Sequence, residues 1–160
     1  MRVLSLFCLL LACVSFESCK NDQAEKAAKI AKEKAEEIVS STCYKATYET
    51  DTVDLKINTL KSGKVSGDLV MKLFANPKKI GEIYGEFHGD TLLVSYTFID
   101  EGNEKVTYKN PMAFLKKGDE LILGNGKMET SMGATYFVKG EPIDYENVKF
   151  KFAKVECAGK

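Results

Sequence analysis

The sequence of 160 residues lacks an excess of either charge, because 23 lysine and arginine residues balance 23 aspartate and glutamate residues. A balanced chain has no net field that would draw it to nucleic acid or to anionic lipid. The only histidine, His88, has no second histidine and no CxxC spacing to complete a metal site. GxSxG and Walker-type motifs are also missing. We therefore expect no nucleic-acid partner, no cofactor and no enzymatic activity, and we expect His88 to be a solvent-exposed strand residue.

One long apolar run opens the chain. Arg2 gives a short basic start, and the apolar stretch Val3–Val14 follows it. The run is shorter than the roughly 20 residues that a membrane-spanning helix needs, and its basic start is typical of a secretory signal. Residues 1–18 are therefore expected to be a signal peptide and are excluded from the fold. No later stretch approaches that length, so acyl chains would be the only attachment to a membrane.

Two cysteines compete for the end of this signal. Cys13 follows Leu-Leu-Ala, which resembles a bacterial lipobox, and Cys19 follows the looser Phe-Glu-Ser. Lipidation of Cys19 leaves Cys43 and Cys157 as an even pair in an oxidising compartment. Cleavage at Cys13 would leave Cys19 as an odd thiol near the membrane. We favour Cys19 as the lipid-bearing residue, with Cys13, or an ordinary signal peptide without lipid, as the alternatives.

The segment after Cys19 consists of strong helix formers. Asp22–Val39 is rich in alanine, glutamate and lysine and contains no glycine, proline or aromatic residue. Asp22 and Glu25 have the spacing of a capping box. The pattern predicts a polar helix that acts as a spacer of about 25 Å, inside a tether over residues 19–41. Packing of this helix on the following domain or on a partner helix is the alternative.

Residues 42–160 have the size and the pattern of one β-domain. From Thr42 onward apolar and polar residues alternate with a period of two, and short turns such as Lys61–Lys64 and Gly89–Asp90 separate the runs. The alternation slips at Ala153, which predicts a bulge in the last strand. After the strand that begins near Thr42, the candidate strands are Val53–Ile57, Val65–Leu73, Ile83–Phe87, Leu92–Phe98, Lys105–Leu115, Glu120–Gly124, Thr135–Val138 and Val148–Cys157.

About eight short strands, joined mostly by tight hairpins without intervening helices, predict an all-β antiparallel meander. Closure into an up-and-down, lipocalin-like barrel would remove the unpaired edges, and a sandwich or an open curled sheet is the alternative. Cys43 begins the first strand and Cys157 ends the last, so closure would make them neighbours. A disulfide between them would stabilise the fold by about 4.7 kcal/mol at most in the chain-entropy model. Two free buried thiols are the alternative.

Three features are candidates for ligand binding. The acidic segment Asp100–Glu104 carries oxygen ligands suited to calcium, but its spacing is not that of an EF-hand, and a solvated turn is the preferred interpretation. Gly124–Gly126 is expected to be a glycine-rich hairpin, since no strand–loop–helix context for phosphate surrounds it. The aromatic residues either fill the core or line a ligand cup. They are Tyr44, Tyr48, Tyr84, Tyr96, Tyr108 and Tyr136 with Phe74, Phe87, Phe98, Phe114, Phe137, Phe150 and Phe152.

Several turn and strand motifs resemble a family of small lipoproteins of the Bacteroidota. They are Gly67-Asp68-Leu69, Gly85, Gly89-Asp90-Thr91-Leu92, Tyr96-Thr97-Phe98, Glu101-Gly102 and Ala113-Phe114-Leu115-Lys116. The resemblance covers most of Cys43–Cys157 and implies a cell-envelope lipoprotein with a β-rich domain, anchored to the outer membrane on its periplasmic or cell-surface face. It implies no activity and no catalytic residue. The charged stretch Lys20–Asp22 with Glu25 is similar to the signals that favour surface export in that phylum.

We therefore expect a non-enzymatic binding module that holds a small apolar ligand or an envelope component in its cup or at its rim. The alternative is a protein-interaction or inhibitor module. In that case the exposed loops Asp100–Glu104 and Met128–Gly133 would contact another envelope protein, and the two methionines would make the second loop adaptable.

Overall fold

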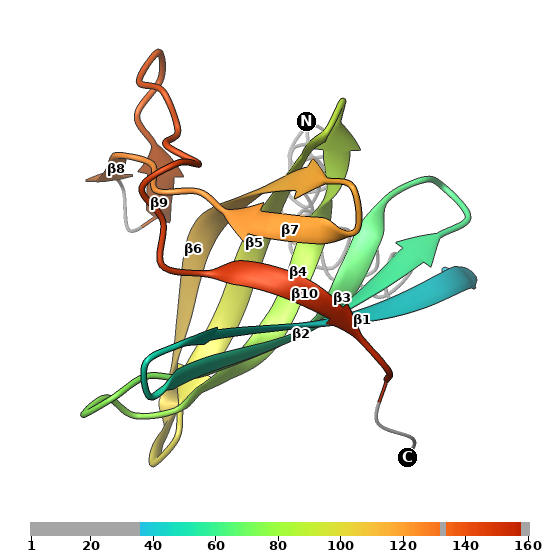
Figure 1. Ribbon diagram of the computed structural model, residues 1–160. Coiled ribbons are helices and arrows are strands. Elements are labelled where there is room, and N and C mark those ends of the chain that lie inside the picture. Colours follow the sequence, from blue (N-terminus) through green and yellow to red (C-terminus); the bar gives the residue numbers. More distant parts are fainter. Residues whose placement is uncertain (1–35, 132–133, 158–160) are drawn as a thin grey trace, which may run out of the picture. The chain divides into compact units, whose positions relative to one another are not determined.

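The alternating segments fold into a closed barrel with a small hairpin beside it. The computed structural model describes residues 36–131 and 134–157. Eight antiparallel strands close in the order β1-β10-β7-β6-β5-β4-β3-β2, and β8 pairs with β9 in a separate sheet (Figure 1). The strands are β1 (Ile38–Tyr48), β2 (Asp51–Leu60), β3 (Val65–Lys72), β4 (Lys79–His88), β5 (Thr91–Asp100), β6 (Asn103–Lys117), β7 (Glu120–Leu123), β8 (Met128–Ser131), β9 (Ala134–Phe137) and β10 (Lys151–Val155). The predicted all-β, up-and-down barrel of eight strands is confirmed.

The first and last barrel strands meet where the sequence predicted. Cys43 of β1 lies opposite Val155 of β10. Cys43 and Cys157 form a disulfide with an S–S distance of 2.06 Å and a Cα–Cα distance of 5.1 Å. The bond joins residues that are 114 positions apart, so it locks the closure of the barrel.

Glycine allows the chain to turn and to approach itself closely. Gly89, in the predicted turn between β4 and β5, has a φ of 62°, which a residue with a side chain rarely adopts. Gly85 has a different role within β4. A Cβ atom at this position would overlap the carbonyl oxygen of Leu93 on β5, so only glycine permits this approach of two barrel strands.

The interior of the barrel is occupied by side chains. A single cluster of buried residues includes Val53 and Leu55 of β2, Leu69 of β3, and Tyr96 and Phe98 of β5. The Tyr96 hydroxyl donates a hydrogen bond of 3.1 Å to the Leu69 carbonyl oxygen, so this buried polar atom is satisfied. Burial raises the pKa of the Tyr96 phenol, with a further contribution from the Asp100 charge, and keeps it protonated. These residues form the hydrophobic core that stabilises the barrel.

The end of the predicted N-terminal helix was placed incorrectly. Ile38 and Val39 were assigned to it, whereas both belong to β1, where Ile38 lies opposite Leu60. Their β-branched side chains favour a strand once a partner strand is available. Glu36 and Glu37, also assigned to the helix, are not helical, and the Glu37 carbonyl oxygen accepts a hydrogen bond of 3.0 Å from the Lys61 amide. The rest of that helix (residues 22–35), the signal peptide, and Cys13 and Cys19 lie outside the described residues.

The predicted bulge at Ala153 was wrong. The pairing of β10 with β1 passes from Lys45–Ala153 through Tyr44–Lys154 to Cys43–Val155 without a shift. Val155 is 42% exposed on the outer face, so the break in the apolar pattern has another cause. Phe152 points into the core, and the chain leaves the barrel soon after it. β10 therefore needs no further inward apolar residue.

Two segments expected to be loops take part in pairing. Met128–Ser131 was expected to be loop, whereas it forms β8 and pairs with β9. Gly124–Gly126 is not a hairpin, because Asn125 forms an isolated bridge with Asp144. No helix within the described part of the chain is long and apolar enough to cross a membrane.

Candidate functional site

The aromatic residues divide between the core and the surface. Phe114 and Phe152 are fully buried and pack edge to face at 5.6 Å between ring centroids. Phe74 and Tyr136 are 77% and 52% exposed. The inward aromatic residues thus fill the barrel, as the core-packing interpretation expected. The outer face of the barrel is therefore the candidate binding surface.

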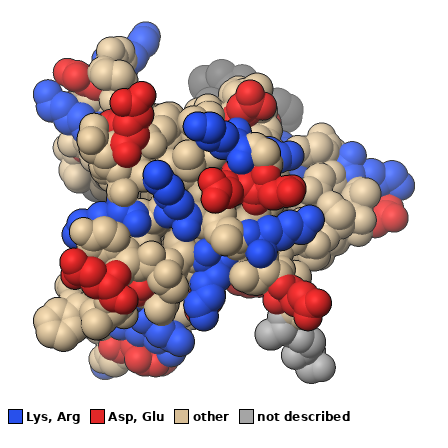
Figure 2. All heavy atoms as spheres, in the orientation of Figure 1, with Lys and Arg blue, Asp and Glu red and all other residues tan. Residues whose placement is uncertain are grey.

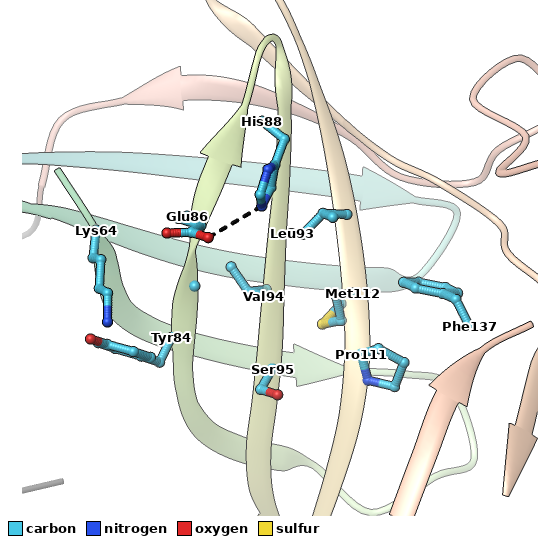
Figure 3. Close-up of a pocket in the computed structure, with 11 residues that line it drawn as sticks. Lys64, Tyr84, Glu86, His88, Leu93, Val94, Ser95, Pro111, Met112 and Phe137 are labelled. Atoms are coloured by element: carbon cyan, nitrogen blue, oxygen red, sulfur yellow. Dashed lines mark ion pairs between the residues drawn. The ribbon is translucent and has the colours of Figure 1, made fainter. Parts of the chain in front are cut away.

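A groove of about 380 Å³ lies on the outer face of the barrel (Figure 3). Tyr84 of β4, Leu93 and Ser95 of β5 and Pro111 of β6 line it, and Phe137 of β9 closes one side. Along β5 these outward residues alternate with the buried Leu92, Val94 and Tyr96. The groove is therefore formed by the outer face of three neighbouring strands and the β8–β9 hairpin.

Local packing holds Phe137 beside the groove. A Cβ atom at Gly126 would lie 2.5 Å from the Phe137 ring, so the absence of a side chain at position 126 makes room for this ring. Ala113, an outward residue of β6, is completely buried. Its carbonyl oxygen accepts a hydrogen bond of 2.9 Å from the Gly124 amide, at the start of the segment that leads to the hairpin. The hairpin is thus fixed at its base.

The polar groups of the groove suit binding. The Lys64 ammonium lies 5.3 Å from the centre of the Tyr84 ring. His88 is exposed, as predicted, and its Nε2 atom lies 3.4 Å from a Glu86 carboxylate oxygen. The Tyr84 hydroxyl is buried without a hydrogen-bond partner. This hydroxyl points toward Lys64, away from Leu93 and Phe137 (Figure 3), so the Tyr84 ring and not its hydroxyl faces an occupant.

Two of the three carboxylates in the acidic segment Asp100–Glu104, which joins β5 to β6, pair with lysine. Asp100 pairs with Lys79 at 2.7 Å, and Glu101 pairs with Lys78 at 2.7 Å. The carboxylates are thus held by ammonium groups from the start of β4. Among the described residues, no three histidine, cysteine or acidic side chains gather as a metal site.

The segment before β10 is held by Asp144. One carboxylate oxygen accepts hydrogen bonds from the Glu146 and Asn147 amides at 2.7 and 3.1 Å, and the other accepts one from the Asn147 side chain at 3.0 Å. These bonds lower the pKa of the Asp144 carboxyl. This direction is opposite to the raised pKa that a general acid needs at neutral pH. The carboxylate therefore has a structural role here.

The sequence did not predict a groove on the outer face. Tyr84 and Phe137 were named only as aromatic residues of the core or of a cup, and Leu93 and Pro111 were missed, although one signal could have revealed them. Inward positions were identified by alternation, and Tyr84, Leu93 and Pro111 are apolar or aromatic residues at the opposite, outward positions. Apolar residues that gather on the solvent face of neighbouring strands indicate a contact surface. Phe137 could not be found this way, because its position depends on how the hairpin folds over the barrel.

The chain was also compared with known proteins. No family model, no curated protein and no solved structure matches it.

Proposed function

We propose that this protein is a lipid-anchored, non-enzymatic binding module of the cell envelope that holds another envelope protein on the outer face of its barrel. The observation that carries the proposal is the placement of apolar surface. The interior is occupied by a packed core, whereas the groove beside Leu93, Pro111 and Phe137 is open. Because buried side chains pack together in the interior, the open outer face is the better candidate for recognition.

The anchor completes the proposal. Cys19 would carry the lipid, with Cys13 as the alternative, and the outer membrane is the proposed location. The Cys43–Cys157 disulfide suits an oxidising compartment. Lysine and acidic side chains are interspersed over the visible face (Figure 2), so an anchor would supply the membrane attachment that charge does not.

A second candidate is a small apolar ligand in the same groove. Its volume of about 380 Å³ lies within the usual range of ligand sites, and Leu93, Pro111 and Phe137 would give a bound molecule apolar contacts. Native mass spectrometry of protein purified from its own host tests this version. A bound molecule that is lost from Leu93→Glu would support it, and a consistently empty protein would exclude it.

Site-specific photocrosslinking in intact cells tests the main proposal. A photoreactive residue at position 93 would sit in the groove, and the same residue at position 80 is the matched control. Leu93 and Ile80 are outward strand residues that are 38% and 37% exposed, and Ile80 does not line the groove. We expect one discrete protein adduct from position 93 that disappears with Pro111→Asp. Equal adducts from both positions, or none from either, would contradict a binding role for the groove.

A further inference from the structure

Several strand edges are not fully paired, since β1, for example, pairs with β10 only over residues 43–45, and two of these edges belong to elements that line the groove. β7 covers only residues 114–117 of β6, so residues 103–113 of β6 have no strand on that side. The other open edge belongs to the β8–β9 hairpin, which forms a sheet of its own. An unpaired edge presents free backbone N–H and C=O groups to any strand that approaches. The two edges differ in how they are protected.

The β6 edge is blocked by its own sequence. The Ala113 carbonyl bonds to the Gly124 amide, on the side away from β5. Because backbone groups alternate in direction along a strand, Pro111 and Lys109 also direct theirs toward this open side. Proline has no N–H to offer, and lysine on an edge disfavours pairing with another strand. The open edge of β6 is therefore poorly suited to pairing with an added strand.

The outer edge of β8 has neither a proline nor a lysine to prevent pairing with another strand. The Val138 amide donates a hydrogen bond of 2.9 Å to the Lys127 carbonyl, so the backbone groups of Lys127 point toward β9. From Lys127 onward, the backbone groups of β8 alternate between pointing toward β9 and away from it. The backbone groups of Met128 and Thr130 must then point away from β9. All four residues of β8 are exposed, and the strand contains no lysine or proline. Within the described part of the chain, no backbone bond engages these outward groups.

The negative charge of Glu129 on β8 disfavours a second copy of the chain at this edge and favours a basic partner segment. Antiparallel pairing with a second copy, using both outward residues, would place Met128 opposite the copy's Thr130. That register sets Glu129 directly opposite Glu129 of the copy, and like charges in this position repel. Glu129 lies opposite Tyr136 in the ladder, on the same face of the hairpin. A lysine or arginine directly opposite Glu129 on an added strand would meet a carboxylate of opposite charge.

We propose that β8 binds an extended segment of a partner protein by strand addition, and that this segment carries a basic residue opposite Glu129. The proposal rests on the proposed function and names the partner's chemistry. Residues next to the basic one would project to the other face of the hairpin, where Met128 lies opposite Phe137. The partner segment therefore has a lysine or arginine flanked by apolar residues, with no proline between them.

Selection from a random peptide library on the full-length mature chain tests this proposal. We expect enrichment of proline-free peptides with a basic residue between apolar ones. Binding of a selected peptide should fall at least tenfold in Thr130→Pro, which removes an outward N–H but no backbone bond of the hairpin. This variant and the Thr135→Pro control both lose the 3.4 Å hydrogen bond between the Thr130 and Thr135 hydroxyls, so that loss is matched. Thr135→Pro is the matched control, because Thr135 lies opposite Thr130 and its N–H points out from the other edge. Hydrogen exchange on both variants confirms that the hairpin persists.

Reversing the charge of residue 129 tests more directly which central residue the bound peptides prefer. Glu129→Lys should change the preferred central residue from basic to acidic, whereas Glu104→Lys on β6 should leave the preference unchanged. Peptides unaffected by Thr130→Pro, or no enrichment, would overturn the proposal. A dimer in light scattering that is lost in Thr130→Pro would assign the edge to a second copy instead. If the adduct at position 93 persists while the edge tests fail, the binding module stands and only the edge is excluded.

Discussion

The barrel and the β8–β9 hairpin use the same alternation of side chains, and they differ in what covers the faces. On β5, Leu92, Val94, Tyr96 and Phe98 are at most 5% exposed, whereas every residue of β8 is exposed. Each barrel strand pairs on both sides and each hairpin strand on one. A two-stranded hairpin is only marginally stable by itself. We therefore expect the stability of the molecule to be concentrated in the barrel, and the recognition surface that we propose lies at the hairpin.

Opening the barrel at its covalent closure should have the largest effect on stability. Replacing both Cys43 and Cys157 with serine releases a loop that spans 114 positions. The free energy of unfolding should fall by up to about 4.7 kcal/mol, because the unfolded chain regains the entropy that the cross-link removed. Urea denaturation measures this change. Reductant should destabilise the wild type and leave the double variant unchanged, and an equal response of both would contradict the prediction.

A pair of aromatic truncations compares the two regions directly. Phe152→Ala removes a completely buried ring and should cost about 3–5 kcal/mol of unfolding free energy, since the core cannot fully collapse around the cavity. Tyr136→Ala on β9 removes a ring that is 52% exposed, and its effect should lie within about 0.5 kcal/mol. Denaturation midpoints of the two variants give the comparison. Equal losses would show that the hairpin is as strongly integrated as the core.

A polar change inside the barrel should have an intermediate effect. Tyr96→Phe keeps the ring and deletes the hydroxyl that bonds to the Leu69 carbonyl. The loss should be about 1–3 kcal/mol, because a buried carbonyl loses a hydrogen-bond partner. Thermal unfolding with a circular dichroism readout measures it. Tyr108→Phe, at a position 38% exposed, is the control and should be nearly neutral. A neutral Tyr96→Phe would mean that water replaces the phenol.

The sequence predicts the barrel well because the two features that define it, alternation along each strand and one cysteine pair, can be read directly from the residues. Alternation along each strand assigns the inward residues, and the cysteine pair joins the first strand to the last. The end of the helix at Val39 was harder to place, since alanine, glutamate and lysine favour a helix up to the residue where a partner strand becomes available. The partner of Ile38 is Leu60, and alternation alone does not reveal that contact.

The candidate site was less predictable than the barrel. The groove exists because Phe137 is brought beside Leu93 and Pro111 by a hairpin whose base is fixed through Gly124, Gly126 and Ala113. Such contacts depend on tertiary packing between segments whose own patterns are weak. β8 itself has four residues, Met-Glu-Thr-Ser, which contain too little alternation to predict a strand. Recognition surfaces built from short, exposed strands are difficult to read from sequence for this reason.

The smallest effect should come from Asp144, which braces the segment between the hairpin and β10. Its carboxyl has a lowered pKa in the folded protein, chiefly because the Glu146 and Asn147 amides bond to the charged form. A lowered pKa means that the contribution is present above the unfolded value of 3.8 and is lost as the pH falls through the folded value. Because the carboxylate is fully exposed, the loss should be local. After correction for the intrinsic exchange rate at each pH, the protection of the Glu146 and Asn147 amides should fall in wild type as the pH drops below 3.8.

The Asp144→Asn variant provides the control for that measurement. Its Glu146 and Asn147 amides should be less protected at neutral pH, and their protection should not fall further on acidification, because the asparagine side chain has no charge to lose. Phe114 and Phe152 should keep their protection in both proteins, since the barrel does not depend on this turn. If acid instead released the core amides together with those of the turn, the segment would unfold with the barrel, and the separation of a stable barrel from a weaker peripheral layer would be wrong.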